Sequence, residues 1–151
     1  MEIQIVWGKG EGMSELSSFD LAMIDAEIGD FNLVTLTSMI PKGALIRKVG
    51  KYKNLKKRKV GDILNVVMAK NVSRGPAFLS AGLGWAQADE GGIFLEIAGE
   101  KKKDVQRELE RGLEEMMNAR NWAWRDEIES KIVETYSKNF GCVLVVAVYD
   151  V

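Results

Sequence analysis

The sequence predicts a mixed α/β domain in which β-sheets are covered by helices. Short runs rich in β-branched and aromatic residues recur along the 151-residue chain, separated by turn signals that contain glycine or proline. Two longer stretches instead place apolar residues at helical spacing. With 46% hydrophobic and 28% charged residues, the composition is that of a folded protein, and the length suits one domain spanning residues 1–151.

The N-terminal part of the chain is predicted to form a strand, a loop, a helix and a second strand. Alternation in residues 3–7 indicates a strand, and glycines make residues 8–15 a loop. A helix follows, with Ser14 as its N-cap and Gly29 as its stop. Its apolar residues recur at helical spacing: Leu16, Phe19, Met23 and Ile24. Residues 31–40 alternate again and predict a strand that leads into a proline-containing loop.

The remaining elements follow from the same two periodicities. Further strands are expected at residues 44–50, 61–72, 77–87, 91–100, 128–138 and 141–151. The clearest helix covers residues 102–122, and one of its faces carries Val105, Leu109, Leu113, Met116 and Met117. No internal repeat or linker divides the chain, which favours a single unit.

Several protein classes are excluded by what the sequence lacks. The longest apolar runs are too short to span a bilayer, so no membrane association is expected. The N-terminus has no basic segment followed by an apolar one, as a signal peptide would. Cys142 is the one cysteine, which excludes a disulfide framework and indicates a reducing, cytoplasmic location.

The chain contains no histidine, which restricts the chemistry that it can perform. Histidine is the usual general base and a common metal ligand, so no metal site is expected, and Ser-His-Asp and Cys-His mechanisms are excluded within the chain. Neither a Walker loop nor a GxGxxG motif is present. An enzyme with this sequence must use carboxylates, hydroxyls, amines, amides, or a bound or built-in cofactor.

The densest charge run extends from Arg47 to Lys59, in the sequence RKVGKYKNLKKRK. Such a run could contact a nucleic acid or an acidic partner, but it is also typical of a solvated loop. The net charge of the chain is only −1, and aromatic residues do not interleave with the run as a base-stacking surface requires. These two observations favour a solvated loop over a nucleic-acid-binding segment.

Glu96 is the acidic residue whose surroundings point most clearly to chemistry. In a strand of period two it shares a face with Phe94 and Ala98, in an otherwise apolar segment. A carboxyl on an apolar face is expected to have a raised pKa, which would make it a proton donor near pH 7. The alternative is a glutamate on an edge strand that faces water.

Other polar residues give no signal when each is taken alone. Thr37 and Ser38 are adjacent hydroxyls at the end of a predicted strand and could simply be packed polar side chains. Asp20 on the first helix could be a surface charge, and Asn32 could cap or turn the chain.

Their context changes this interpretation, because three blocks of the sequence resemble the pyruvoyl-dependent arginine decarboxylase family. In SFDLAMIDAEIGDFNLVTLTSMIP the resemblance rests on Phe19-Asp20, Ile28-Gly29, Asn32-Leu33, Thr37-Ser38 and Met39-Ile40-Pro41. The blocks SAGLGWAQADEGGIFLEIAGEKKKD and NWAWRDEIESKIVETYSKNFGCVLVVAV continue the resemblance over nearly the whole chain. The sequence departs from the family pattern at Lys42, where a second proline is common, and in the basic stretch 50–60, which lacks the family's prolines.

The resemblance implies a layered αββα sandwich of mostly antiparallel sheets, and a cofactor that the protein makes from itself. The Ser38 Oγ would attack the Thr37 carbonyl, and the chain would be cut between residues 37 and 38. A pyruvoyl group derived from Ser38 would remain, and its carbonyl would form a Schiff base with the substrate amine and accept the electrons left by departing CO₂.

The resemblance also assigns roles to individual residues. Asn32 would be the oxyanion donor during the cut, Glu96 would protonate the α-carbon of the substrate, and Asp20 would bind its cationic tail. The family builds trimers, in some cases paired as dimers of trimers, with active sites between subunits. The expected activity is conversion of arginine to agmatine and CO₂ for polyamine biosynthesis. Two alternatives stay open: a decarboxylase for another amino acid such as histidine, and an unprocessed, non-catalytic trimeric homologue.

Overall fold

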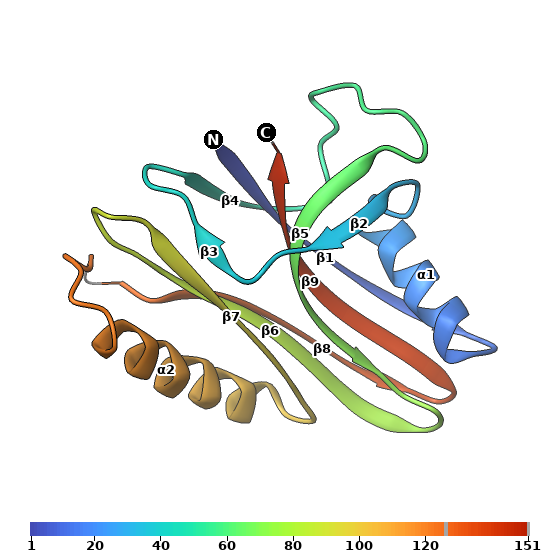
Figure 1. The fold of residues 1–151 in the computed structure, drawn as a ribbon. Helices are drawn as coiled ribbons and strands as arrows, with labels where there is room; N and C mark the ends of the chain where they lie inside the picture. Colours follow the sequence, from blue (N-terminus) through green and yellow to red (C-terminus); the bar gives the residue numbers. More distant parts are fainter. Residues whose placement is uncertain (126, 151) are drawn as a thin grey trace.

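Two β-sheets pack face to face, and one helix covers the outer side of each sheet (Figure 1). The computed structural model describes residues 1–125 and 127–150. The elements of this part of the chain are β1 (Glu2–Gly12), α1 (Glu15–Asp25), β2 (Asn32–Thr35), β3 (Met39–Ile40), β4 (Leu45–Gly50), β5 (Ile63–Val72), β6 (Ala77–Gln87), β7 (Gly92–Gly99), α2 (Lys102–Asn118), β8 (Glu129–Ser137) and β9 (Phe140–Asp150). The predicted αββα sandwich is confirmed.

The two sheets differ in strand order and size. The five-stranded sheet has the order β2-β5-β9-β1-β4, and the four-stranded sheet has the order β3-β7-β6-β8. The pairs β1–β4 and β2–β5 are parallel, whereas the other strand pairs are antiparallel. Strands β2 and β3 therefore lie at the same side of the sandwich, each at the edge of a different sheet. None of the helices in the described ranges is long and apolar enough to cross a membrane.

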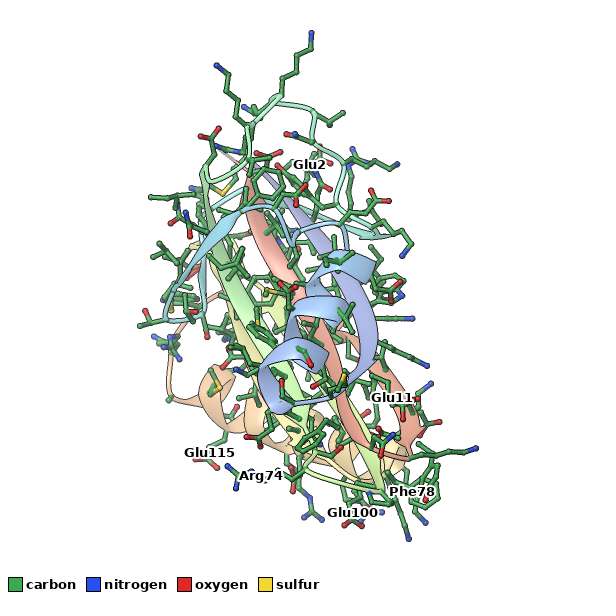
Figure 2. The ribbon with its side chains drawn as sticks, turned by 90° about the vertical axis from the view of Figure 1, so that its right-hand side faces the viewer. Glu2, Glu11, Arg74, Phe78, Glu100 and Glu115 are labelled. Carbon is green, nitrogen blue, oxygen red and sulfur yellow. The ribbon has the colours of Figure 1, made fainter. Side chains whose placement is uncertain are left out.

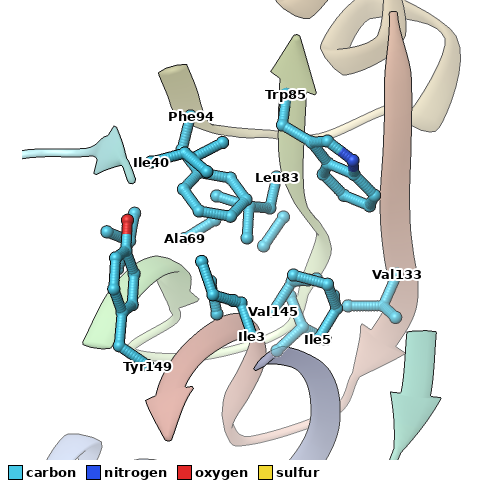
Figure 3. Close-up of a cluster of buried hydrophobic side chains, with 14 of the residues drawn as sticks. Ile3, Ile5, Ile40, Ala69, Leu83, Trp85, Phe94, Val133, Val145 and Tyr149 are labelled. Atoms are coloured by element: carbon cyan, nitrogen blue, oxygen red, sulfur yellow. The ribbon is translucent and has the colours of Figure 1, made fainter. Parts of the chain in front are cut away.

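The main core lies between the sheets and consists of inward-facing residues from both (Figure 3). Its largest contributors are Ile3, Ile5, Leu83, Trp85, Phe94, Val145 and Tyr149. The predicted apolar face of α2 is confirmed, because Val105, Leu109 and Leu113 are buried against the outer side of the four-stranded sheet. A buried layer on each side of both sheets explains why β9 is apolar at nearly every position.

The glycine-rich stretch that follows the first predicted strand is itself a strand. The prediction of a loop at residues 8–15 is wrong over most of its length, because β1 continues to Gly12. The glycines are needed for contact with α1: a Cβ atom on Gly8 would lie 2.1 Å from the Ala22 carbonyl oxygen, and one on Gly10 would lie 2.3 Å from that of Ser18. Helix α1 therefore packs directly on the backbone of β1.

Helix α1 turns its small residues toward the sheet and leaves large apolar residues in solvent. Ser18 and Ala22 are buried, whereas Leu16 is 76% exposed and Ile24 is 53% exposed. Residues at i, i+4 and i+8 share one helix face, so Leu16, Asp20 and Ile24 form an outward stripe. Figure 2 views the molecule from the side that α1 covers. The outward stripe therefore combines two exposed apolar side chains with one carboxylate.

The ends of α1 are only partly as predicted. Ser14 is the N-cap, and its hydroxyl accepts a hydrogen bond from the Ser17 N–H in a capping box. The helix ends at Asp25 with Ala26 as the C-cap, before the predicted stop at Gly29. The chain turns at Glu27, which adopts a φ of 61°.

The predicted strand at residues 31–40 is two strands in two different sheets. Strand β2 pairs with β5 in the five-stranded sheet, and β3 pairs with β7 in the four-stranded sheet. Residues 36–38 carry the chain from one sheet to the other, with the Leu36 N–H still bonded to the Val66 carbonyl. Ser38 interrupts the strand conformation because its φ is +79°.

Candidate active site

Ser38 lies at the point where the chain crosses between the sheets, and its polar atoms are engaged by β7. Its hydroxyl donates a hydrogen bond to the Glu96 Oε1. Its carbonyl oxygen accepts one from the Phe94 N–H at 2.8 Å. The side chain is half-buried, so the nucleophile predicted from the sequence is held in one place at the edge of the core.

The backbone of Ser38 is in a conformation that non-glycine residues rarely adopt. A left-handed residue with a Cβ atom typically costs about 1–3 kcal/mol, and it persists only where the surroundings enforce it. Here the following residues, Met39 and Ile40, are fixed by pairing with Ile93 and Gly92 of β7. The peptide bond between Thr37 and Ser38 therefore precedes a strained residue.

Glu96 occupies the face of β7 that the sequence predicts. Phe94 belongs to the core between the sheets, and Leu95 packs against the layer under α2, so alternation directs Glu96 inward. Its contact with the Ser38 hydroxyl shows that the carboxyl reaches residue 38. The two residues are 58 positions apart in the sequence and are brought together by β3–β7 pairing.

Tyr149 is a third polar group at this place, and the sequence analysis missed it. It lies near the end of β9, is only 5% exposed, and donates a hydrogen bond from its hydroxyl to the Met39 carbonyl at 2.6 Å. Burial raises the pKa of Tyr149, and the negative charge of Glu96 raises it further. The hydroxyl is therefore a protonated donor at neutral pH. The available signal was a tyrosine that follows the aliphatic run from Val143 to Val148.

Asn32 is not brought to the Thr37–Ser38 bond within one chain. Its Nδ2 donates to the Gly61 carbonyl at 2.8 Å, and the side chain is exposed. It stands at the start of β2, whose extended backbone puts its Cα roughly 10 Å from that of Thr35, and Thr37 lies beyond the end of the strand. An oxyanion donor must lie within about 3 Å of the oxygen that it serves.

Asp20 is also distant from Ser38 in the single chain. It is exposed on the outward stripe of α1, on the far side of the five-stranded sheet from the core that contains Glu96 and Tyr149. One chain thus assembles Ser38, Glu96 and Tyr149 but leaves Asp20 and Asn32 on its outer surface. Within residues 1–125 and 127–150, no group of three or more metal-ligating side chains converges.

Comparisons with known proteins agree on one family. The sequence model of the family described as pyruvoyl-dependent arginine decarboxylase matches residues 2–150. The chain is 33% identical to the pyruvoyl-dependent arginine decarboxylase of Halobacterium salinarum, over 97% of this chain and 92% of the relative. It is 34% identical to pyruvoyl-dependent arginine decarboxylase 2 of Archaeoglobus fulgidus, over 90% of this chain and 83% of the relative. It is also 34% identical to the pyruvoyl-dependent arginine decarboxylase of Methanopyrus kandleri, over 77% of this chain and 73% of the relative.

Proposed function

Because the chain belongs to the pyruvoyl-dependent arginine decarboxylase family, we propose that it converts arginine to agmatine and CO₂ with a pyruvoyl group that it makes from Ser38. The observation that carries this proposal is the state of Ser38: a strained, left-handed serine at a crossover between sheets, with its hydroxyl on a carboxylate. The residues around Ser38 suit the formation of such a group. The Ser38 hydroxyl contacts the Glu96 carboxylate, and the Phe94 N–H donates a hydrogen bond to the Ser38 carbonyl.

The cut begins with attack by the Ser38 Oγ on the carbonyl carbon of Thr37. The C–N bond breaks, and the product is an ester between the Thr37 carboxyl and the Ser38 oxygen, with a free amine on Ser38. Removal of the Ser38 α-proton then breaks the Cβ–Oγ bond and releases Thr37 as a carboxylate. The dehydroalanine that remains takes up water and loses ammonia.

The Phe94 N–H is placed to assist the elimination step. When the α-proton of Ser38 leaves, negative charge passes onto the Ser38 carbonyl oxygen. That oxygen already accepts a hydrogen bond from the Phe94 N–H at 2.8 Å. A fixed backbone donor aimed at a developing oxyanion stabilises the charge without reorganisation.

In the mature protein, the pyruvoyl group supplies the electron sink for loss of CO₂ from the substrate. Glu96 would deliver the proton that the α-carbon must then gain, since its carboxyl lies at residue 38. The inward face of β7 and the core around Phe94 exclude bulk water from one side of this carboxyl. With Glu96 as the acid, protonation of the substrate α-carbon would not require a histidine, which the chain lacks.

Asp20 and Asn32 enter the site from a second copy of the chain. The family resemblance implies a trimer, and the outward stripe formed by Leu16, Asp20 and Ile24 is an apolar surface suited to such an interface. The exposed Asp20 carboxylate would bind the substrate guanidinium bidentately, and Asn32 would donate to the oxyanion at Thr37.

We also assign the protein to the cytoplasm, because its sole cysteine, Cys142, is free and buried.

Mixing two variants, one that cleaves slowly and one that does not cleave, should test this shared site. Asn32→Ala alone should cleave roughly 10²–10³ times more slowly, because one oxyanion donor is lost, and Ser38→Ala alone should not cleave. When the two are co-expressed, Asn32→Ala chains next to Ser38→Ala chains regain a donor and should cleave at the wild-type rate. Mass spectrometry distinguishes the chains. Unchanged slow cleavage in the mixture would mean that Asn32 does not act across an interface.

The proposed activity is tested on the wild-type protein itself. Denaturing mass spectrometry should show one fragment that ends at Thr37 and another that starts with a blocked pyruvoyl group at position 38. The cleaved protein should release agmatine from arginine. Faster release of CO₂ from histidine than from arginine would assign another substrate, and a full-length chain that persists on ageing would indicate a non-catalytic homologue.

A further inference from the structure

Tyr149 makes a cross-sheet hydrogen bond to the segment that carries residue 38. Its hydroxyl belongs to β9 of the five-stranded sheet, whereas its acceptor, the Met39 carbonyl, belongs to β3 of the four-stranded sheet. Figure 3 shows the ring reaching from β9 toward Ile40, with its oxygen at the end nearest that residue. The bond therefore fixes the position of β3 relative to the opposite sheet.

Packing around the Tyr149 ring fixes the direction in which its hydroxyl points. The ring is 5% exposed and meets Phe94 edge to face, with centroids 6.1 Å apart and an interplanar angle of 62°. A buried ring in such contacts has little rotational freedom, so its O–H is fixed as firmly as the core. Phe94 is also the residue whose N–H holds the Ser38 carbonyl, so one packed unit holds two successive carbonyls.

Cleavage would increase the importance of these contacts. A cut between Thr37 and Ser38 makes residue 38 a chain end, and chain ends fray unless they are tied down. Strand β3 is only two residues long and pairs with β7 through Met39 and Ile40. The buried Ile40 side chain packs into the core between the sheets, and the Tyr149 bond adds a directional contact from this short end to the other sheet.

We propose that Tyr149 is a positioning residue: it holds residue 38 in place for the self-cleavage reaction and then holds the resulting terminus for decarboxylation. The inference rests on the proposed function, since it assigns a role within that reaction. Tyr149 does not touch the bonds that change; it acts through the Met39 carbonyl.

Tyr149→Phe is the direct test, because it removes the oxygen and keeps the ring. The variant leaves the Met39 carbonyl without its donor, so self-cleavage should slow by about tenfold. Hydroxylamine cuts the ester on Ser38, so its addition reports whether the first step has occurred. Tyr136→Phe is the matched control, because it removes a tyrosine hydroxyl that is half exposed on the outer side of β8.

Two further measurements separate positioning from general destabilisation. In the cleaved variant, kcat for arginine should fall by about tenfold while KM changes little. Hydrogen exchange should become faster at the Met39 and Ile40 amides but stay unchanged in β5, which serves as the internal reference. Faster exchange in both places would make Tyr149 merely structural.

The outcomes for Tyr149 and for the proposed function can be told apart. If the wild type cleaves and Tyr149→Phe matches it in cleavage, kcat and exchange, the role of Tyr149 is overturned while the enzyme assignment stands. If the wild type never cleaves, the proposed function fails, and the role of Tyr149 in that reaction fails with it.

Discussion

Ser38→Ala should leave the chain whole and abolish decarboxylation. The nucleophile of the cut and the carbon that becomes the pyruvoyl carbonyl both come from this residue, so no other group can replace it. Intact-mass spectrometry of purified protein should show one species at the full-length mass, with no agmatine released from arginine. The fold should persist, because Ser38 is only half-buried and lies between β2 and β3 rather than inside either strand.

Thr37→Val is the matched control for this experiment. It removes the neighbouring hydroxyl and keeps the carbonyl that is attacked, so cleavage should continue and release a fragment that ends in valine. Cleavage of the Ser38→Ala chain at the same bond would assign the cut to a protease. Loss of cleavage in Thr37→Val would show that the first hydroxyl takes part in the reaction.

Glu96→Gln should cleave itself normally and yet decarboxylate poorly. Glutamine keeps the size of the side chain and can still contact the Ser38 hydroxyl, but it cannot donate a proton to carbon. General acid catalysis is typically worth about 10²–10⁴-fold, so kcat should fall by about that factor while substrate binding changes little. Cleavage by mass spectrometry and agmatine release should be measured on the same sample.

The hydrogen bond between Ser38 and Glu96 is the reason to measure self-cleavage of Glu96→Gln as well as its decarboxylase activity. A carboxylate that accepts from a nucleophilic hydroxyl can also act as its base. If Glu96→Gln fails to cleave, Glu96 belongs to the processing step. Full turnover of arginine by the cleaved variant would assign the proton donor to another group. Glu134→Gln, an exposed carboxylate on β8, is the control.

Periodicity was sufficient to predict most of the strands and the face of β7 on which Glu96 lies. Alternation marks strands with one buried face, a continuous apolar run marks β9, and alternation in β7 placed Glu96 with Phe94. Periodicity could not reveal the crossover at residues 36–38, since the alternation of residues 31–40 continues through it. Which sheet a strand joins depends on distant partners, here β5 for β2 and β7 for β3.

The other differences also arise from tertiary contacts. Glycine usually marks loops, but in β1 it provides room for the backbone of α1, and this cannot be known before the helix is placed. Tyr149 resembles an ordinary core tyrosine until its acceptor on β3 is known. The roles of Asp20 and Asn32 could be suggested only by the family resemblance, because a single chain does not contain the surface that they would face.

The position of β1 inside the five-stranded sheet determines whether the two fragments of a cleaved chain would stay together. The fragment 1–37 contributes β1, which is paired on both sides, with β4 and with β9. Without it, the remainder would lose an interior strand of the five-stranded sheet and expose the core to which Ile3 and Ile5 belong. Cleavage between residues 37 and 38 would therefore add the dissociation of two fragments to the unfolding reaction, so the melting temperature of the cut protein should depend more steeply on protein concentration than that of the uncut Ser38→Ala chain. The two fragments of the cut chain would have to associate again before the sheet could reform.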